Sequence, residues 1–417
     1  MRSISVVLLV VLLSACSQGI VPTNDEALGS AAMMEKQIVA GGVVANAPNA
    51  QFGRSVALEG DRMVVTCECV GRAAVAYILE RTGAGVWRNV KTLRTPKPTY
   101  TYMEPQATLS GDTVVISSAE TGIVSVFEQN QGGLNNWGLV KELRGSRLYY
   151  DGFGEGISLD NNTLVVGAFM SNVGTTEYQG SAYVFQRHRG GINNWGQVAQ
   201  LSASDGQSWD SFGSSVAVSG DTVVVGAYTD DSGSNFSQGS AYLFERDEGG
   251  VNQWGQTQKL LASAPLPYDF FGADVAIDSD TLVVGAYFSY SNDGEGFAFV
   301  FERGATQWSR VKKLIASDAA RGDYFGSAVA IDEDTILVGA VYDAVGANPG
   351  QGSAYMFRRN RGGEDNWGQL RKLTASDGAS VDYYGSALAV SGTTIVIAAP
   401  LNDVEENTDK GTVYTYE

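Results

Sequence analysis

The chain has 417 residues, of which 28 are lysine or arginine and 46 are aspartate or glutamate, so its formal net charge at pH 7 is −18. This charge disfavours nucleic acid as a partner, because a phosphate backbone is held by cationic side chains. A single histidine and three cysteines also exclude a histidine-rich metal site and a framework of disulfide bonds.

The first element is an export signal. Arg2 precedes an apolar run from Ile4 to Leu13, and small residues then lead to Cys16 in the sequence Leu-Ser-Ala-Cys. An apolar run of about ten residues is far shorter than the roughly 20 that a membrane-spanning helix needs. We therefore interpret residues 1–15 as a cleaved secretory signal.

The residues up to Cys16 resemble the bacterial lipobox, in which the cysteine is acylated and becomes the first residue of the mature protein. The resemblance implies a membrane anchor at Cys16; an ordinary cleaved signal with a nearby cysteine is the alternative. Ser17 stands where the pattern for inner-membrane retention has aspartate, so in a Gram-negative host we expect the outer membrane. Residues 16–35 are predicted to be the lipidated cysteine and a flexible tether.

The two remaining cysteines, Cys67 and Cys69, lie in a strand-like segment with one residue between them. A soft metal would need two further ligands, and nothing nearby supplies them. We expect two buried thiols here and no disulfide.

Residues 36–417 repeat one unit seven times. Four copies are nearly interchangeable and read FGSSVAVSGDTVVVGAY or a close variant, followed by a polar loop, a QGSAYLF-like segment and a tryptophan; they begin at Phe153, Phe212, Phe271 and Phe325. Three divergent copies begin at Phe52, around Met103 and at Tyr384. A period of 50 to 60 residues is typical of propellers and solenoids.

Each copy holds four short segments rich in valine and aromatic residues, and no helical period follows the signal. We predict an all-β fold, a seven-bladed β-propeller with four antiparallel strands in each blade. The last copy ends at Glu417 without its fourth strand, and residues 36–44 stand where such a strand would precede the first copy. We expect this N-terminal strand to complete the last blade and to bury Ile38, Val39 and Val43.

These repeats resemble the FG-GAP repeat family, whose best-known members form the seven-bladed propeller of integrin α-chains. The resemblance covers about residues 36–417 and implies the fold, whereas propellers support many unrelated functions. Integrin-type repeats often carry a DxDxDG calcium loop. Its place is taken here by tight hairpins such as Asp278-Ser279-Asp280, which offer too few oxygen ligands, so we expect no cofactor.

The parity of a four-stranded meander sorts the loops onto two faces. The turns between the first and second and between the third and fourth strands lie on one face, which we call the hairpin face; its sequences are monotonous, and we interpret it as structural. His188 belongs to one of these turns, where we interpret it as a solvated side chain. The remaining loops and the blade-to-blade connections lie on the opposite face, which we call the variable face.

The variable face is rich in carboxylates and aromatic side chains, which suit a glycan or a protein partner. Our candidates for partner binding on this face are Trp209, Asp230, Asp231, Phe236, Tyr290, Asp293, Tyr342 and Asp343. If a calcium ion binds at all, the candidate ligands are Asp230, Asp231, Asp293, Asp343 and Asp403.

An aspartate recurs two residues before the aromatic residue that opens five of the units, at Asp151, Asp210, Asp269, Asp323 and Asp382. Two interpretations stay open: each aspartate caps a turn, or together they form a ring of ligands round the central channel. One of them completes an Arg321-Gly322-Asp323 tripeptide, which we attribute to chance.

No catalytic residue is expected, because a lone histidine cannot build a Ser-His or Cys-His system and no phosphate-binding loop is present. We predict a non-catalytic binding or adhesion module anchored in the cell envelope, with a protein or glycan partner. The alternatives are a carbohydrate-active hydrolase that uses paired carboxylates on the variable face, and a purely structural envelope component.

Overall fold

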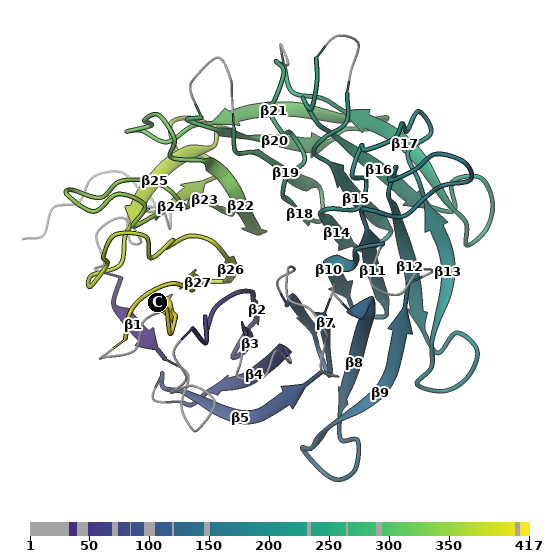
Figure 1. The fold of residues 1–417 in the computed structure, drawn as a ribbon, viewed down its shortest axis with the longest axis horizontal. Coiled ribbons are helices and arrows are strands. Elements are labelled where there is room, and N and C mark those ends of the chain that lie inside the picture. Colours follow the sequence, from purple (N-terminus) through teal and green to yellow (C-terminus); the bar gives the residue numbers. More distant parts are fainter. Residues whose placement is uncertain are drawn as a thin grey trace, which may run out of the picture. The chain divides into compact units, whose positions relative to one another are not determined.

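The computed structural model describes residues 33–39, 49–68, 74–83, 85–95, 105–118, 121–145, 151–231, 235–263, 266–288, 294–404 and 409–417. Every regular element in these ranges is a β-strand, and 28 strands form seven four-stranded antiparallel sheets. Figure 1 shows the sheets set round a central axis in chain order, which confirms the seven-bladed propeller. None of the described residues forms a helix long and apolar enough to cross a bilayer.

The first three blades each consist of four consecutive strands. Blade 1 contains β2 (Val56–Glu59), β3 (Arg62–Glu68), β4 (Ala74–Arg81) and β5 (Trp87–Arg94). Blade 2 contains β6 (Ala107–Ser110), β7 (Thr113–Ser118), β8 (Ile123–Gln129) and β9 (Trp137–Arg144). Blade 3 contains β10 (Phe153–Asp160), β11 (Thr163–Ala168), β12 (Ser181–Arg187) and β13 (Trp195–Leu201).

Blades 4 to 6 follow the same order, and blade 7 borrows its outer strand. Blade 4 contains β14 (Val216–Ser219), β15 (Thr222–Ala227), β16 (Ser240–Arg246) and β17 (Trp254–Leu260). Blade 5 contains β18 (Val275–Asp278), β19 (Thr281–Ala286), β20 (Phe297–Arg303) and β21 (Trp308–Leu314). Blade 6 contains β22 (Phe325–Asp332), β23 (Thr335–Ala340), β24 (Ser353–Arg358) and β25 (Gly368–Leu373), and blade 7 contains β26 (Leu388–Ser391), β27 (Thr394–Ala399), β28 (Thr412–Tyr416) and β1 (Glu35–Ile38).

The hydrophobic core lies between neighbouring blades. Strand β15 is buried along its whole length, because other blades cover both faces of its sheet. One buried cluster joins Val224 and Leu243 of blade 4 to Phe271, Leu282 and Phe299 of blade 5. Each blade is therefore stabilised by its neighbours, as expected when a single sheet cannot bury both of its own faces.

The glycines of the repeated motif allow adjacent blades to meet backbone to backbone. Gly226 lies against the carbonyl of Gly272 in the next blade, so that a side chain at this position would collide with it. Gly213 has φ +94°, a conformation that favours glycine, and lies against the carbonyl of Ser181. The FG and GA parts of the motif thus encode the packing between blades.

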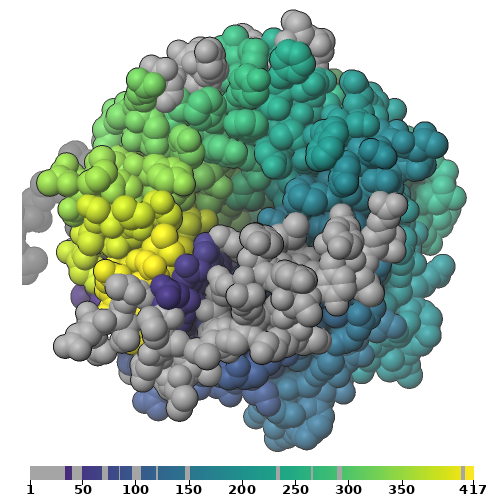
Figure 2. All heavy atoms as spheres, viewed as in Figure 1, coloured from purple at the N-terminus to yellow at the C-terminus, as the bar shows by residue number. Residues whose placement is uncertain are grey.

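The N-terminal strand closes the ring as expected. Strand β1 pairs with β28 in antiparallel register, with Glu35 opposite Tyr416 and Ile38 opposite Val413. Figure 2 shows the purple N-terminal residues beside the yellow C-terminal blade. The strand ends at Ile38, and Val39 is 41% exposed, so the expected burial of Val39 is wrong.

Five sequence-based expectations concern residues that are not described or only partly described. The signal over residues 1–15, the acylated Cys16 and Val43 lie outside the described residues, as does most of the tether. The expectation of two free thiols is wrong, because Cys67 is disulfide-bonded and fully buried. The other two cysteines, Cys16 and Cys69, are not among the described residues, so the partner sulfur lies outside them.

Candidate functional site

The two faces are assembled as the meander requires. In blade 4 the first two strands are joined by a tight turn, in which Ser219 pairs with Thr222. The N–H of Arg246, at the end of the third strand, donates to the carbonyl of Asp221 in that turn at 2.8 Å. The end of the third strand therefore lies on the hairpin face, and the loop over residues 228–239 lies on the variable face.

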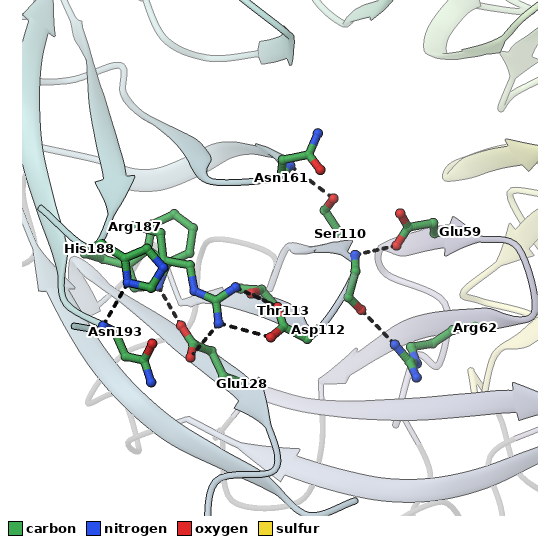
Figure 3. Close-up of polar contacts among 12 residues, drawn as sticks. Glu59, Arg62, Ser110, Asp112, Thr113, Glu128, Asn161, Arg187, His188 and Asn193 are labelled. Carbon is green, nitrogen blue, oxygen red and sulfur yellow. Dashed lines mark hydrogen bonds and ion pairs between the residues drawn. The ribbon is translucent and has the colours of Figure 1, made fainter.

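The hairpin face carries a closed ring of hydrogen bonds between blades. The last residue of each blade's first strand accepts a backbone N–H from the first turn of another blade, and at blade 7 the acceptor is Ser391, which takes the N–H of Gly60 in blade 1 at 3.0 Å. Figure 3 shows Ser110 of blade 2 accepting from Asn161 of blade 3. The seven acceptors are Glu59, Ser110, Asp160, Ser219, Asp278, Asp332 and Ser391. The carboxylates that stand where integrin-type repeats have a calcium loop therefore accept hydrogen bonds from the next blade.

A second layer of the hairpin face consists of arginine contacts between blades. Arg187 of blade 3 pairs with Glu128 at 2.9 Å and with Asp112 at 2.7 Å, both of blade 2, and lowers the pKa of Asp112. The indole Nε1–H of Trp195 donates to Glu128 at 3.1 Å. Figure 3 shows this cluster, in which Glu128 is only 1% exposed. Burial and pairing of this kind identify the cluster as structural.

His188 acts in its turn as a hydrogen-bond acceptor. Its Nδ1 accepts the N–H of Asn193 at 3.1 Å. In the equivalent turn of blade 2, the side-chain oxygen of Asn130 accepts the N–H of Asn135 at 2.8 Å. The histidine therefore replaces an asparagine in an exposed turn.

Two candidate carboxylates of the variable face are buried, which corrects the expectation that they face a partner or a metal ion. Asp230 is 1% exposed and pairs with Lys259 of its own blade at 2.7 Å. Asp343 is 4% exposed and pairs with Lys372 at 2.6 Å in blade 6. A tyrosine of the third strand donates to a neighbouring aspartate in both blades, as Tyr242 does to Asp205 at 3.0 Å. The same ion pair and tyrosine hydrogen bond thus occur in blades 4 and 6, which identifies them as structural. A buried ion pair needs such additional hydrogen bonds to compensate for its loss of water.

The recurring aspartates cap turns and do not form a ring of ligands. Asp151 accepts the N–H of Phe153, two residues later, as an Asx-turn requires. The other four accept the N–H of the residue three positions earlier at 2.6 to 2.8 Å; they are Asp210, Asp269, Asp323 and Asp382. All five are at most 4% exposed, and burial raises the pKa of Asp210 to about 7. Asp323, the last residue of the Arg-Gly-Asp tripeptide, is therefore not displayed to a partner.

An aromatic cleft of about 510 Å³ opens on the variable face between blades 3, 4 and 5. Trp209 stacks on Tyr178 with ring centroids 4.2 Å apart and is 64% exposed, and Phe236 is 61% exposed. The remaining wall is both aromatic and polar; it comprises Phe169, Met170, Ser208, Ser211, Tyr228, Thr229, Asp231, Ser237 and Tyr268. The volume lies in the range of small-molecule sites, which combine apolar walls with a few polar groups.

The loops of the cleft are fastened to one another. The hydroxyl of Thr229 donates to the carbonyl of Trp209 at 2.7 Å, and the N–H of Tyr268 donates to the carbonyl of Phe236 at 2.8 Å. The carboxylate of Asp231 accepts the N–H of Ser237 at 2.6 Å. The aromatic side chains are thus held by their loops before any ligand arrives.

Aromatic side chains occupy strained backbone positions at this cleft. Trp209 and Tyr268 have φ of 73° and 64°, in the left-handed region that only glycine adopts without cost. The equivalent residue of blade 6 is Gly322, with φ 84°. Val381 holds the same position in blade 7 with φ 70°, outside the cleft, so the conformation belongs to the repeat and the exposed tryptophan is what distinguishes the cleft.

A series of ring contacts continues from the cleft along the variable face. Neighbouring centroids are 4.8 to 5.9 Å apart, and the rings are those of Tyr228, Phe270, Tyr287, Tyr324, Tyr342 and Tyr383. We call this series the aromatic arc. Burial among these rings raises the pKa of Tyr287 to about 12.

Comparison with known protein families identifies the repeat. Five segments match the FG-GAP repeat, at residues 148–185, 195–244, 254–301, 308–357 and 367–416, and together they make up more than half of the chain. The chain belongs to the FG-GAP repeat family. No curated protein matches it.

The FG-GAP propeller brings together some of the predicted site residues and separates others. Trp209, Asp231 and Phe236 meet in the cleft, and Tyr342 lies in the aromatic arc. Asp403 is exposed outside the cleft lining and accepts the N–H of Asp409 at 2.9 Å. Tyr290 and Asp293 lie outside the described residues.

Sequence reasoning missed Phe169, Tyr178 and most members of the aromatic arc. The repeat could have revealed the arc, because its members come either directly before the FG pair or within two residues after the Gly-Ala pair. Within the described residues no group of three histidine, cysteine, aspartate or glutamate side chains is placed to hold a metal ion. The central channel of the FG-GAP propeller forms a second cavity of about 560 Å³, lined by the first strands of all seven blades and by Arg54, Glu155 and Asp274.

Proposed function

We propose that this FG-GAP propeller is a non-catalytic binding protein of the cell envelope that holds a glycan in the aromatic cleft of its variable face. The observation that carries the proposal is Trp209, which is 64% exposed at the cleft wall and stacks on Tyr178. Large aromatic side chains gathered in solvent around a cleft indicate a surface that contacts a ligand.

The composition of the cleft favours a sugar over an apolar ligand. The C–H face of a pyranose ring packs on flat aromatic surfaces such as those of Trp209 and Phe236. Its hydroxyl groups need donors and acceptors at the rim, which Asp231, Ser208 and Ser211 supply. Because the loops are already fastened to one another, binding costs little ordering entropy.

The burial of the carboxylates supports binding without catalysis. A glycoside hydrolase needs two carboxyl groups that reach the scissile bond. Burial raises the pKa of Asp210 to about 7, as in some catalytic acids, yet Asp210 and the neighbouring Asp230 are only 2% and 1% exposed. The same pair recurs in blade 6 as Asp323 and Asp343, which suits a role in the repeat.

Trp209→Gly tests the proposal directly, because glycine suits the backbone at φ 73° and the fold should lose nothing. On a glycan array, the wild-type protein is expected to bind a defined group of glycans with and without calcium. The Trp209→Gly protein is expected to lose at least about tenfold in affinity. Val381→Gly is the matched control, since Val381 holds the equivalent position in blade 7, at φ 70°, outside the cleft.

Two results would contradict the proposal. Equal loss in the Trp209→Gly and Val381→Gly proteins would mean that the cleft is not the binding site. Absence of binding by the wild-type protein to any glycan would reject the glycan and turn the search to a protein partner.

Anchoring through Cys16 is tested separately in cells. Cys16→Ser is expected to move the protein from the membrane fraction to the soluble envelope fraction and to abolish labelling with a radioactive fatty acid. A protein that stays in the membrane fraction without the label would show that something other than the lipid holds it there.

A further inference from the structure

Three apolar side chains project from the hairpin face at the turns between the third and fourth strands of blades 2, 3 and 4. Leu134 is 88% exposed, Ile192 is 91% exposed and Val251 is 85% exposed. They occupy the same position in three consecutive blades, within the sequences GGLNNW, GGINNW and GGVNQW. Exposed apolar residues that recur on one face of a protein indicate a contact surface.

The turns hold these side chains away from the protein. In blade 2, the side chain of Asn130 accepts the N–H of Asn135 at 2.8 Å, and the side-chain amide of Asn136 donates to the carbonyl of Gln131 at 2.7 Å. In blades 3 and 4 the first of these bonds is made to His188 and to Asp247. The apolar side chains therefore stand at the tips of fastened turns.

The turn itself does not need an apolar residue at its tip. Blade 6 has the same turn, in which Asn360 accepts the N–H of Asp365 at 2.8 Å, and its tip residue is the exposed Glu364. Because glutamate serves the turn equally well, the aliphatic side chains of the other three blades need another explanation.

The chain enters the propeller on this same face. Glu35, the first residue of β1, lies opposite Tyr416 at the end of β28, and Lys36 donates to the carbonyl of Gly85 in the turn between β4 and β5 at 3.1 Å. Cys16 precedes the compact unit, which starts at Met34, by 18 residues. If residues 16–35 form the flexible tether predicted from the sequence, a chain of this length would span on average about 23 Å, and a lipid at Cys16 would keep the hairpin face near the bilayer.

We propose that the hairpin face docks on a lipid bilayer, with Leu134, Ile192 and Val251 inserted at its surface. The charged residues on the three turns are of both signs, with Arg189 in blade 3 and Asp247 and Glu248 in blade 4, which suits a surface of zwitterionic lipid. Docking in this orientation turns the aromatic cleft away from the membrane. The inference rests on the proposed anchoring at Cys16 and is independent of the glycan.

The test uses the acylated full-length chain in vesicles of phosphatidylethanolamine and phosphatidylcholine. Leu134→Cys, Ile192→Cys and Val251→Cys are each labelled with an environment-sensitive fluorophore, with Phe236→Cys as the control on the variable face and the unsubstituted chain as the labelling background. Quenching by aqueous iodide is expected to fall at least about fivefold at the three turn tips on membrane binding, and less than twofold at residue 236. Equal quenching at all four positions would overturn the proposal.

A second measurement separates docking from anchoring. The Cys16→Ser protein lacks the lipid but keeps the turn tips, and it is expected to float with vesicles weakly. Adding Leu134→Glu, Ile192→Glu and Val251→Glu, which copy the turn of blade 6, is expected to lower its partitioning by on the order of tenfold or more. Unchanged flotation would overturn the docking proposal. The anchor is tested independently by fatty-acid labelling.

Discussion

The two faces of this propeller use the same residue types for opposite purposes. Trp195, near the hairpin face, is 1% exposed and bonded to Glu128, whereas Trp209 on the variable face is 64% exposed. Asp160 accepts a backbone N–H of the next blade, whereas Asp231 accepts one within its own loop and lines the cleft. Residues found in every repeat thus serve the contact between blades, and residues that depart from the repeat are the candidates for function.

The largest expected contrast is between the two tryptophans. Trp195→Ala removes a buried indole and leaves Glu128 without its N–H donor, so the free energy of unfolding should fall by about 3–5 kcal/mol. Trp209→Ala should change it by less than about 0.5 kcal/mol, because the side chain is exposed. Urea unfolding measures both values, and similar losses in the two proteins would contradict the division between the faces.

The buried carboxylates beneath the variable face should make stability depend on pH. Burial raises the pKa of Asp210 to about 7, so the folded state favours the protonated form. The resulting stabilisation is complete below the ordinary pKa near 4 and is lost as the pH rises to about 7. Asp210→Asn keeps an acceptor for the N–H of Gln207 and removes this titration.

Relative to the wild-type protein, Asp210→Asn should gain up to about 4 kcal/mol between pH 4 and pH 8, since one pKa unit corresponds to about 1.4 kcal/mol. The measurement is the free energy of unfolding at several pH values. Parallel curves for the two proteins would show that Asp210 does not titrate in this range.

Two aspartates that accept similar hydrogen bonds sharpen the comparison. Asp160→Ala and Asp231→Ala each remove an acceptor at 2.6 Å from a backbone N–H. Each should cost about 1 kcal/mol of stability, but only Asp231→Ala should weaken glycan retention, because only Asp231 lines the cleft. Thermal unfolding and glycan affinity are measured on the same samples, and a glycan defect in Asp160→Ala would contradict the assignment of the cleft.

The smallest effect is expected at the only histidine. His188→Asn should leave stability within about 0.5 kcal/mol of the wild-type value, because asparagine makes the same bond in the turns of blades 2 and 6. His188→Ala, which lacks an acceptor, serves as the comparison and should lose more. A functional loss in His188→Asn would contradict the structural interpretation of the hairpin face.

Much of the candidate site could be predicted from sequence, and the part that could not has a clear reason. The repeat predicted the two faces, and Trp209, Asp231 and Phe236 do meet in one cleft. Asp230 and Asp343 were chosen for the same loop position, yet Lys259 and Lys372 of the fourth strands bury them. Asp230 and Asp231 are adjacent residues of the same type, so only the packing of the blade distinguishes them.

The number of blades, the strand order and the closure by an N-terminal strand can all be predicted from the repeats alone. This is possible because each repeat carries the same valine-rich strands and glycines, and both faces of every sheet are buried when the blades stack on one another. The pairing of the carboxylates and the choice of aromatic rings in the cleft and the arc are visible only in the tertiary structure. The same is true of the apolar turn tips that share the face on which the chain enters. Those properties depend on contacts between residues far apart in the sequence, from 17 positions for Phe270 and Tyr287 to 381 positions for Glu35 and Tyr416. No local pattern records the direction in which a loop turns its side chains.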